Sequence, residues 1–265
     1  EVSNVSDFNN NAVYEAYEPG SAFKVIAMGI ALDSGKVTPS TTYEDTGVVK
    51  LAGYSIKNSD KLGHGTVTMT GVLEKSLNTG MIFATQNVPN PVFEKYIKNF
   101  GFGQLYNAQL DQEVKGDISS LAKQGEIHKA TASFGQGITV TPLQLVNAVN
   151  VIANDGKLMQ PYIVEEVRYP DGRVVKTQPK VLRQVIKPQT ASQVGAMMVS
   201  VVDNGFGKKA GVPGYYIAGK TGTAQVAENG AYGGKTVQSF VGFGPVDKPR
   251  FTMVTKLTNP SGAGW

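Results

Sequence analysis

The strongest constraint on the fold is an apolar run over residues 22–32 that is interrupted only by Lys24. A Pro-Gly corner precedes this run and Gly35 follows it, so the pattern predicts a helix with a defined start and end. Ser21 and Lys24 are three residues apart and would share one face of that helix, which lets their side chains meet. Ser21 would also lie at the helix N-terminus, where unpaired N–H groups and the helix dipole favour negative charge. A serine that must become an alkoxide benefits from this position, and a neutral lysine one turn away could take its proton.

Two further short motifs follow later in the chain. S-x-x-K alone is a weak signal, because an N-capping serine followed by a surface lysine gives the same pattern. Ser76-Leu77-Asn78 reads S-x-N, and Lys220-Thr221-Gly222-Thr223 reads K-T-G-T. The order S-x-x-K, S-x-N, K-T-G corresponds to the motif set of class A β-lactamases and penicillin-binding proteins. We call these the first, second and third motifs; they are so far apart in the sequence that only the fold can bring them together.

The segments around the motifs resemble the transpeptidase domain of class B penicillin-binding proteins, within the penicilloyl-serine transferase (serine β-lactamase-like) superfamily. The resemblance runs from about residue 7 to about residue 260. It implies an α+β fold, in which helices flank an antiparallel sheet and a second lobe is all-helical. The matching segments are Tyr17-Glu18-Pro19-Gly20-Ser21, His64-Gly65-Thr66, Phe134-Gly135-Gln136-Gly137, Thr141-Pro142-Leu143-Gln144-Leu145 and Ala218-Gly219-Lys220-Thr221-Gly222-Thr223-Ala224-Gln225.

The order of predicted elements also favours an α+β fold, since helices fill the middle of the chain and strands come late. We expect one catalytic domain over residues 1–265, with a mainly helical lobe at about 21–155 and a sheet-containing lobe at about 156–265. Because relatives carry further strands at both ends, we expect this chain to lack terminal strands of the sheet. Helices are predicted over 68–75, 92–100 and 189–203, strands over 162–167, 215–220, 237–244 and 250–257, a loop over 1–17, and loops with short strands over 36–65.

Two local signals are especially clear. Thr141 and Gln144 form a capping box around Pro142, which predicts a helix start. The pair Asp171-Gly172 between apolar runs predicts a hairpin. The third motif is expected at the end of the strand over 215–220.

The composition excludes several kinds of site. The chain has no cysteine, which rules out a thiol nucleophile, a zinc–thiolate site and disulfides. His64 and His128 are far apart and lie in no metal-binding or triad pattern, so we interpret each as structural and expect no metal and no cofactor. A serine enzyme of this composition would use lysine as its base. The net charge of +4 comes without a Lys/Arg run, so no nucleic-acid partner is expected.

The resemblance assigns catalytic roles to residues of all three motifs. Ser21 would attack the carbonyl between two D-alanines of a peptidoglycan stem peptide, and Lys24 would be the base. A free lysine has a pKa of about 10.4, so this role requires burial or the charge of Lys220 to lower the pKa of Lys24. Alternatively, Lys24 stays charged and only orients Ser21. Ser76 would relay a proton toward the leaving amine, and Lys220 would tune it.

The remaining motif residues would bind substrate. Asn78 would hydrogen-bond the amide backbone of the substrate, and Thr221 and Thr223 would hold its terminal carboxylate beside Lys220. Gly222 would let the substrate backbone lie against the strand edge. The oxyanion hole would be formed by the backbone N–H groups of Ser21 and Thr223. β-Lactam antibiotics would fit the same cleft, since they present a strained amide and a carboxylate at similar spacing.

Alternative functions stay open: a serine β-lactamase, a β-lactam-binding receptor domain, a scaffold with a degenerate site, and a D,D-carboxypeptidase. No motif places the glutamate that class A β-lactamases need for deacylation, and no motif residue is missing. The resemblance also implies that the full-length protein lies at the outer face of the cytoplasmic membrane, anchored by an N-terminal segment absent from this chain. A glycosyltransferase and other division or elongation proteins are the candidate partners.

Overall fold

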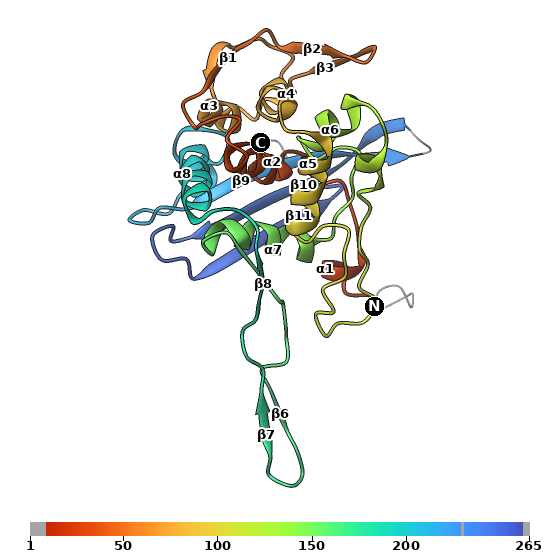
Figure 1. Ribbon diagram of the computed structural model, residues 1–265, viewed down its shortest axis with the longest axis vertical. Coiled ribbons are helices and arrows are strands. Elements are labelled where there is room, and N and C mark those ends of the chain that lie inside the picture. Colours follow the sequence, from red (N-terminus) through yellow and green to blue (C-terminus); the bar gives the residue numbers. More distant parts are fainter. Residues whose placement is uncertain (1–8, 229–230, 262–265) are drawn as a thin grey trace.

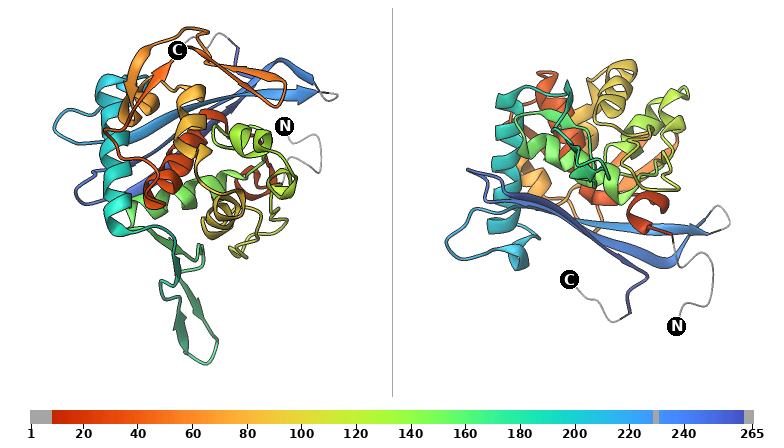
Figure 2. Two further views of the ribbon diagram at one scale, coloured as in Figure 1. Left: turned by 45° about the horizontal axis from the view of Figure 1, so that its top comes forward. Right: turned by 90° about the horizontal axis from the view of Figure 1, so that it is seen from below.

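A three-stranded antiparallel sheet organises the computed structural model, which describes residues 9–228 and 231–261 (Figure 1). Helices α7 and α8 pack on this sheet, α8 against β9 and α7 against β10 and β11. Figure 2 shows the helices gathered on one face of the sheet. This is the expected α+β class. The elements named here are α7 (Pro142–Ala153), α8 (Pro188–Asn204), β9 (Ala218–Glu228), β10 (Ala231–Gly244) and β11 (Phe251–Thr258), in the sheet order β11-β10-β9.

The predicted apolar helix is α2 (Lys24–Asp33), and it lies at the centre of the molecule (Figure 1). It packs against α7, α8 and α4 (Asn78–Gln86), so its first nine residues are buried on every side. The α-helix begins two residues later than predicted, at Lys24 instead of Ala22. A 3-10 turn, η2 (Gly20–Phe23), precedes α2, and Ser21 lies in this turn. Gly35 follows the helix with φ +65°, a conformation that suits glycine.

Residues 36–65 form short strands and loops, as predicted. β1 (Thr42–Asp45) pairs with β4 (Gly65–Thr68), and β2 (Val48–Leu51) pairs with β3 (Tyr54–Lys57). The helix expected at 68–75 is α3 (Met69–Glu74), which Thr68 caps through its side chain. Helix α4 was not predicted. The sequence over 78–86 has no apolar stripe because α4 is buried on several sides, against α2, α3 and α6 (Glu126–Ala132).

Several helices agree with the sequence pattern. The capping box of Thr141 and Gln144 is present at the start of α7. Phe93 and Ile97 of α5 (Asn90–Asn99) are fully buried, as expected for core positions. The expected loop over 1–17 is partly wrong, because α1 (Asn11–Tyr14) lies within it; residues 1–8 lie outside the described part of the chain.

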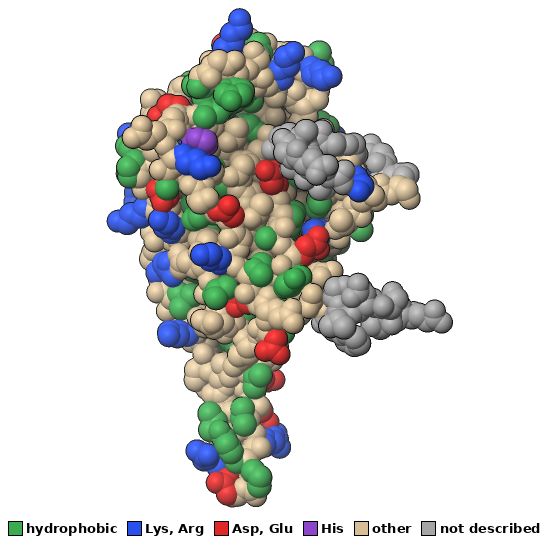
Figure 3. Space-filling model, turned by 90° about the vertical axis from the view of Figure 1, so that its right-hand side faces the viewer, with side chains coloured by type: hydrophobic (Ala, Val, Ile, Leu, Met, Phe, Trp, Pro, Cys, Tyr) green, Lys and Arg blue, Asp and Glu red, His purple; other side chains and the backbone are tan. Residues whose placement is uncertain are grey.

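The Asp171-Gly172 hairpin projects from the body as an arm, which we define as β6 (Glu166–Arg168), β7 (Val174–Lys176) and their turn (Figure 1). The strand expected from residue 162 therefore begins later, at Glu166. β5 (Lys157–Met159) and β8 (Val181–Gln184) pair at its base. Figure 3 shows apolar side chains along the arm, and on that face lysine and arginine are scattered among acidic residues.

The strand that carries the third motif is longer than expected. β9 begins at Ala218 and continues to Glu228, so Lys220 lies near its beginning rather than at its end. Its pairing with β10 explains the length, because the register runs from Ala218–Phe243 to Glu228–Ala231. Over residues 9–228 and 231–261, no helix combines the length and hydrophobicity that a bilayer crossing requires.

Candidate active site

The turn that carries Ser21 packs closely against two other backbone segments, at Thr223 and at Gly135. A Cβ on Gly20 would lie 2.4 Å from the carbonyl oxygen of Thr223, so η2 contacts β9 at the third motif. The Gly20 N–H donates to the carbonyl oxygen of Gly135 at 3.0 Å. Gly20 itself has φ +53°, which glycine adopts without the cost that a side chain adds. Ser21, the next residue, is half-buried beside this junction.

The second motif places a strained residue next to both motif lysines. Ser76 joins α3 to α4 with φ +55°, a conformation that is uncommon outside glycine. Its carbonyl oxygen accepts a hydrogen bond from Lys24 Nζ at 2.5 Å, and its Oγ accepts from Lys24 Nζ at 3.2 Å and from Lys220 Nζ at 2.9 Å. Strained backbone of this kind is often found at functional sites, where the surrounding structure maintains it.

Both motif lysines are completely buried, with 0% exposure each. Burial disfavours the charged amine, and the neighbouring charge of Lys220 adds to this effect, so the pKa of Lys24 lies well below its ordinary value. Burial also lowers the pKa of Lys220 to about 7. A neutral Lys24 can donate two N–H groups to Ser76 and still keep a lone pair. The site can therefore hold a proton acceptor and a cation side by side near neutral pH.

The third motif presents alternate residues to opposite faces of β9. Thr223 is exposed and Thr221 is half-buried, whereas Gly222 between them is buried. A Cβ on Gly222 would lie 2.3 Å from Ser239 Oγ and 2.9 Å from the Cβ of Ala22. The glycine thus lets β9 approach β10 and η2 closely, which differs from the expected role of making room for substrate.

Asn78 lies at the first position of α4, two residues after Ser76. Its Nδ2 donates to the carbonyl oxygen of Lys57 at 2.9 Å, which ties it to the end of β3. Ser76 and Asn78 are both half-buried. The structure thus brings Lys24, Ser76 and Lys220 into direct contact; among the expected site residues, Ser21 lies on η2, Asn78 on α4, and Thr221, Gly222 and Thr223 on β9.

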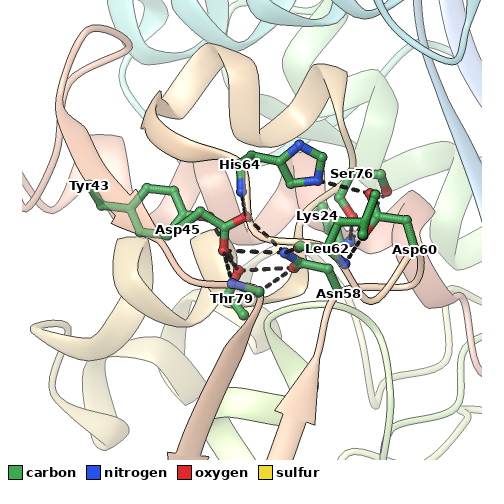
Figure 4. A network of polar contacts seen from close by, with 10 residues as sticks. Lys24, Tyr43, Asp45, Asn58, Asp60, Leu62, His64, Ser76 and Thr79 are labelled. Carbon is green, nitrogen blue, oxygen red and sulfur yellow. Dashed lines mark hydrogen bonds and ion pairs between the residues drawn. The ribbon is translucent and has the colours of Figure 1, made fainter.

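Two further features near the site carried no predicted role. Gly135, within the segment 134–137, has φ +80°, and a Cβ there would lie 2.1 Å from the carbonyl oxygen of Gly20. Asp45, Asn58 and Thr79, which directly follows Asn78, form a buried polar network (Figure 4). His64 bonds Asp60 at 2.8 Å at the edge of this network. No group of three or more metal-ligating side chains occurs among the described residues.

The sequence comparison decides the family. The family model described as "Penicillin binding protein transpeptidase domain" matches residues 2–264. This chain belongs to the penicillin-binding protein transpeptidase family. The transpeptidase domain is 37% identical over 262 residues to "Stage V sporulation protein D" of Bacillus subtilis and 32% identical over 254 residues to "Peptidoglycan D,D-transpeptidase FtsI" of Escherichia coli. These alignments cover 97% and 95% of this chain and 41% of each relative.

The solved structures agree with this membership. Penicillin-binding protein 3 of Mycobacterium tuberculosis, in complex with aztreonam, matches the transpeptidase domain with a TM-score of 0.90 and 32% identity. The match covers 96% of this chain and 59% of that chain. The transpeptidase domain of penicillin-binding protein 3 from Burkholderia pseudomallei matches with a TM-score of 0.87 and 31% identity, over 97% of this chain and 75% of that one. The expected resemblance to class B penicillin-binding proteins is confirmed.

Proposed function

We propose that this transpeptidase domain is the catalytic part of a peptidoglycan D,D-transpeptidase that works through an acyl-enzyme on Ser21. The observation that carries the proposal is the contact of two buried lysines from the first and third motifs with the serine of the second. The names of the relatives support the substrate class, because several are peptidoglycan D,D-transpeptidases.

Acylation follows from the protonation states that burial favours. Ser21 Oγ attacks the carbonyl carbon between two D-alanines, and its proton passes to the neutral Nζ of Lys24. The tetrahedral oxyanion is held by the backbone N–H groups of Ser21 and Thr223, and each such donor contributes about 3–4 kcal/mol to catalysis. The C–N bond then breaks, and the departing D-alanine amine takes the proton through the Ser76 hydroxyl, which contacts both lysines.

Deacylation repeats these steps in reverse with a different amine. The amine of a second stem peptide attacks the Ser21 ester, Lys24 accepts its proton and returns it to Ser21 Oγ, and the new amide is released. With water as the acceptor, the same site would act as a D,D-carboxypeptidase, so the choice of acceptor is part of the proposal.

Substrate binding uses the groups around this centre. The charged form of Lys220 and the hydroxyls of Thr221 and Thr223 attract the terminal carboxylate. Asn78 faces the amide of the donor peptide, which lies extended along β9, the outer described strand of the sheet. Strand addition of this kind provides affinity through backbone hydrogen bonds.

β-Lactam antibiotics are proposed to acylate the same serine. Penicillin-binding protein 3 of M. tuberculosis forms complexes with aztreonam and ampicillin, and it shares this fold. The ester that a β-lactam leaves would persist, since the sequence places no glutamate in the deacylation role of class A β-lactamases. Persistence would separate a transpeptidase or receptor from a β-lactamase.

The chain spans about two fifths of the length of the B. subtilis and E. coli relatives, so its cellular setting is also a proposal. The full-length protein would lie at the outer face of the cytoplasmic membrane, held by an N-terminal anchor. A glycosyltransferase and other division or elongation proteins would be its partners there.

A donor–acceptor assay tests the function. A synthetic stem peptide ending in D-Ala-D-Ala is incubated with the domain, with and without a free-amine acceptor peptide. The products are identified and quantified by mass spectrometry. We expect a cross-linked product and an equal amount of D-alanine, both lost in Ser21→Ala. D-Alanine release without cross-linking would favour the carboxypeptidase. Release of neither from a protein that still binds a β-lactam at Ser21 would favour the receptor.

A further inference from the structure

A buried carboxylate lies beside the second motif without contacting any motif side chain. Asp45, at the end of β1, is only 2% exposed. Its oxygens accept hydrogen bonds from the N–H groups of Gly47 at 3.0 Å and His64 at 3.2 Å, and from Asn58 Nδ2 at 2.9 and 3.2 Å. The Thr79 hydroxyl donates to it at 2.8 Å. A buried carboxylate keeps this many hydrogen bonds only when its donors hold one arrangement, so the network fixes the conformation of the segments that supply them.

Asn58 connects this carboxylate to the first turn of α4. Its Oδ1 accepts from the N–H of Thr79 at 3.2 Å, while its Nδ2 donates to Asp45 (Figure 4). The Tyr43 hydroxyl lies 3.2 Å from Thr79 Oγ1 and supplies a donor when the Thr79 proton goes to Asp45. The three side chains Asp45, Asn58 and Thr79 therefore fix where α4 begins relative to β1 and the loop after β3.

The network also determines what Asn78 can reach. Asn78 directly precedes Thr79, and the carbonyl that holds its Nδ2 belongs to Lys57, which directly precedes Asn58. The contact between Thr79 and Asn58 belongs to the buried network, and the neighbouring contact between Asn78 and Lys57 lies at the site. A shift of either Thr79 or Asn58 would move the contact of Asn78 with it.

The opposite end of α4 is held by a second buried charge. Lys129 of α6 is 5% exposed, and its Nζ donates to the carbonyl oxygens of Gln86 at 3.1 Å and Val88 at 2.9 Å. An anionic group near the helix N-terminus and a cation near its C-terminus both complement the helix dipole. Because α4 is held at its far end and packs along its length on α2, α3 and α6, we expect a disturbed Asp45 network to affect its first turn most.

We propose that Asp45, Asn58 and Thr79 form a positioning network that sets the Asn78 amide for the backbone amide of an acyl donor. The proposal rests on the proposed function of Ser21 and Asn78. It has a specific consequence, because only donors that carry an amide at that place depend on Asn78. Perturbing the network should therefore change the preference between acyl donors more than it changes acylation in general.

Two β-lactams separate these effects. Benzylpenicillin carries an acylamide side chain, whereas 6-aminopenicillanic acid has a free amine in its place. The second-order rate constant for acylation of Ser21 is measured with both, and the preference is their ratio. Thr79→Val removes the hydroxyl and keeps the shape, Thr79→Ser restores a hydroxyl, and Thr85→Val is the matched control. Thr85 lies on the same helix and is equally buried, and its hydroxyl donates to the Met81 carbonyl oxygen one turn earlier, away from the Asp45 network.

We expect Thr79→Val to lower the preference for benzylpenicillin by about three- to tenfold, which corresponds to one hydrogen bond. Thr79→Ser should retain most of the preference, and Thr85→Val should leave it unchanged. In an Asn78→Ala background the preference is already lost, so Thr79→Val should lower it no further; such non-additivity is the signature of residues acting through one another.

An equal slowing with both β-lactams, or a preference that falls again in the Asn78→Ala background, would overturn the proposal. If Thr79→Val does not unfold cooperatively, Tyr43→Phe replaces it, because this change removes only the hydroxyl that contacts Thr79. A smaller fall in the same ratio is then expected, and no fall would contradict the proposal. Failure of the proposed function would look different, since neither β-lactam would label Ser21 in the unchanged protein.

Discussion

The contact of Gly135 with the Ser21 turn gives a prediction that can be worked out in detail. Gly135→Ala places a Cβ 2.1 Å from the carbonyl oxygen of Gly20 and 2.7 Å from its carbonyl carbon and nitrogen. Non-bonded heavy atoms pack at about 3.5 Å, so one backbone must move by about 1 Å or more. Since φ at Gly135 is +80°, the alanine also pays about 1–2 kcal/mol for a left-handed conformation.

The displacement would act directly on the proposed oxyanion hole. The Gly20 N–H loses its bond to Gly135, and the adjacent N–H of Ser21 moves with it. Misplacing one oxyanion donor costs about 10²- to 10³-fold in rate. We expect this loss in the rate constant for acylation by a fluorescent penicillin, together with a fall of at least about 1–2 kcal/mol in the free energy of unfolding.

Gly35→Ala is the matched control. Gly35 also has a positive φ, +65°, but a Cβ there meets nothing within 4 Å. It should show the same conformational loss of about 1–2 kcal/mol in urea unfolding, with acylation unchanged. Gly135→Ala acylating at the original rate, or Gly35→Ala slowing acylation as strongly, would refute the argument.

Three further predictions concern the lysines and the strained serine. Lys220 is charged below a pH of about 7 and neutral above it, so the rate constant for acylation should fall as the pH rises through about 7. Lys220→Arg stays charged, so its acylation rate should not fall over this range. The same fall in Lys220→Arg would contradict the role of the Lys220 charge. Lys129→Met leaves the carbonyl oxygens of Gln86, at the end of α4, and of Val88, just beyond it, without this donor, and should lower the unfolding free energy by about 2–4 kcal/mol, measured by urea denaturation. A loss below about 1 kcal/mol would contradict the role of Lys129 in holding this end of α4. Ser76→Gly should be about 1 kcal/mol more stable than Ser76→Ala, because φ is +55°, while both should acylate slowly; equal melting temperatures would show that the strain is not stored there.

Local signals in the sequence predicted elements whose reasons are local. The capping box needs only the four residues 141–144, because Thr141 and Gln144 bond each other, and it forms as expected. Phe93 and Ile97 follow a helical period and are buried. The Asp171-Gly172 pair likewise predicted the hairpin of the arm, whose connection is local and runs over residues 169–173, with the Gly172 N–H donating to the Tyr169 carbonyl oxygen.

Features that depend on distant contacts were missed. Helix α4 contains Gly80, where a Cβ would lie 2.4 Å from Val72 Cγ2, so its glycine serves close packing on α3 rather than a turn. The extent of β9 depends on its register with β10, which no local pattern encodes. Ser76 has a left-handed backbone that its residue type does not suggest.

The candidate site shows the same division. Motif order singled out the two lysines, and burial accounts for their lowered pKa values. The sequence suggested a Ser21–Lys24 contact from their spacing, whereas the hydrogen bonds from Lys24 Nζ go to Ser76. Ser21 lies in the 3-10 turn, which packs on β9, whereas Lys24 begins the α-helix and reaches Ser76 in the connection between α3 and α4. Gly135 and the Asp45 network carry no chemistry of their own, so only the assembled structure indicates them.

The central claim is that Ser21 is the nucleophile of an assembled three-motif site. The most direct measurement is the intact mass of the protein after incubation with benzylpenicillin, followed by peptide mapping of the adduct, with Ser21→Ala in parallel. With Ser21 as the nucleophile, we expect one penicilloyl group on the peptide that contains Ser21, stable for many minutes after excess drug is removed, and none in Ser21→Ala. An adduct that maps to another residue, or one that forms equally in Ser21→Ala, would contradict it.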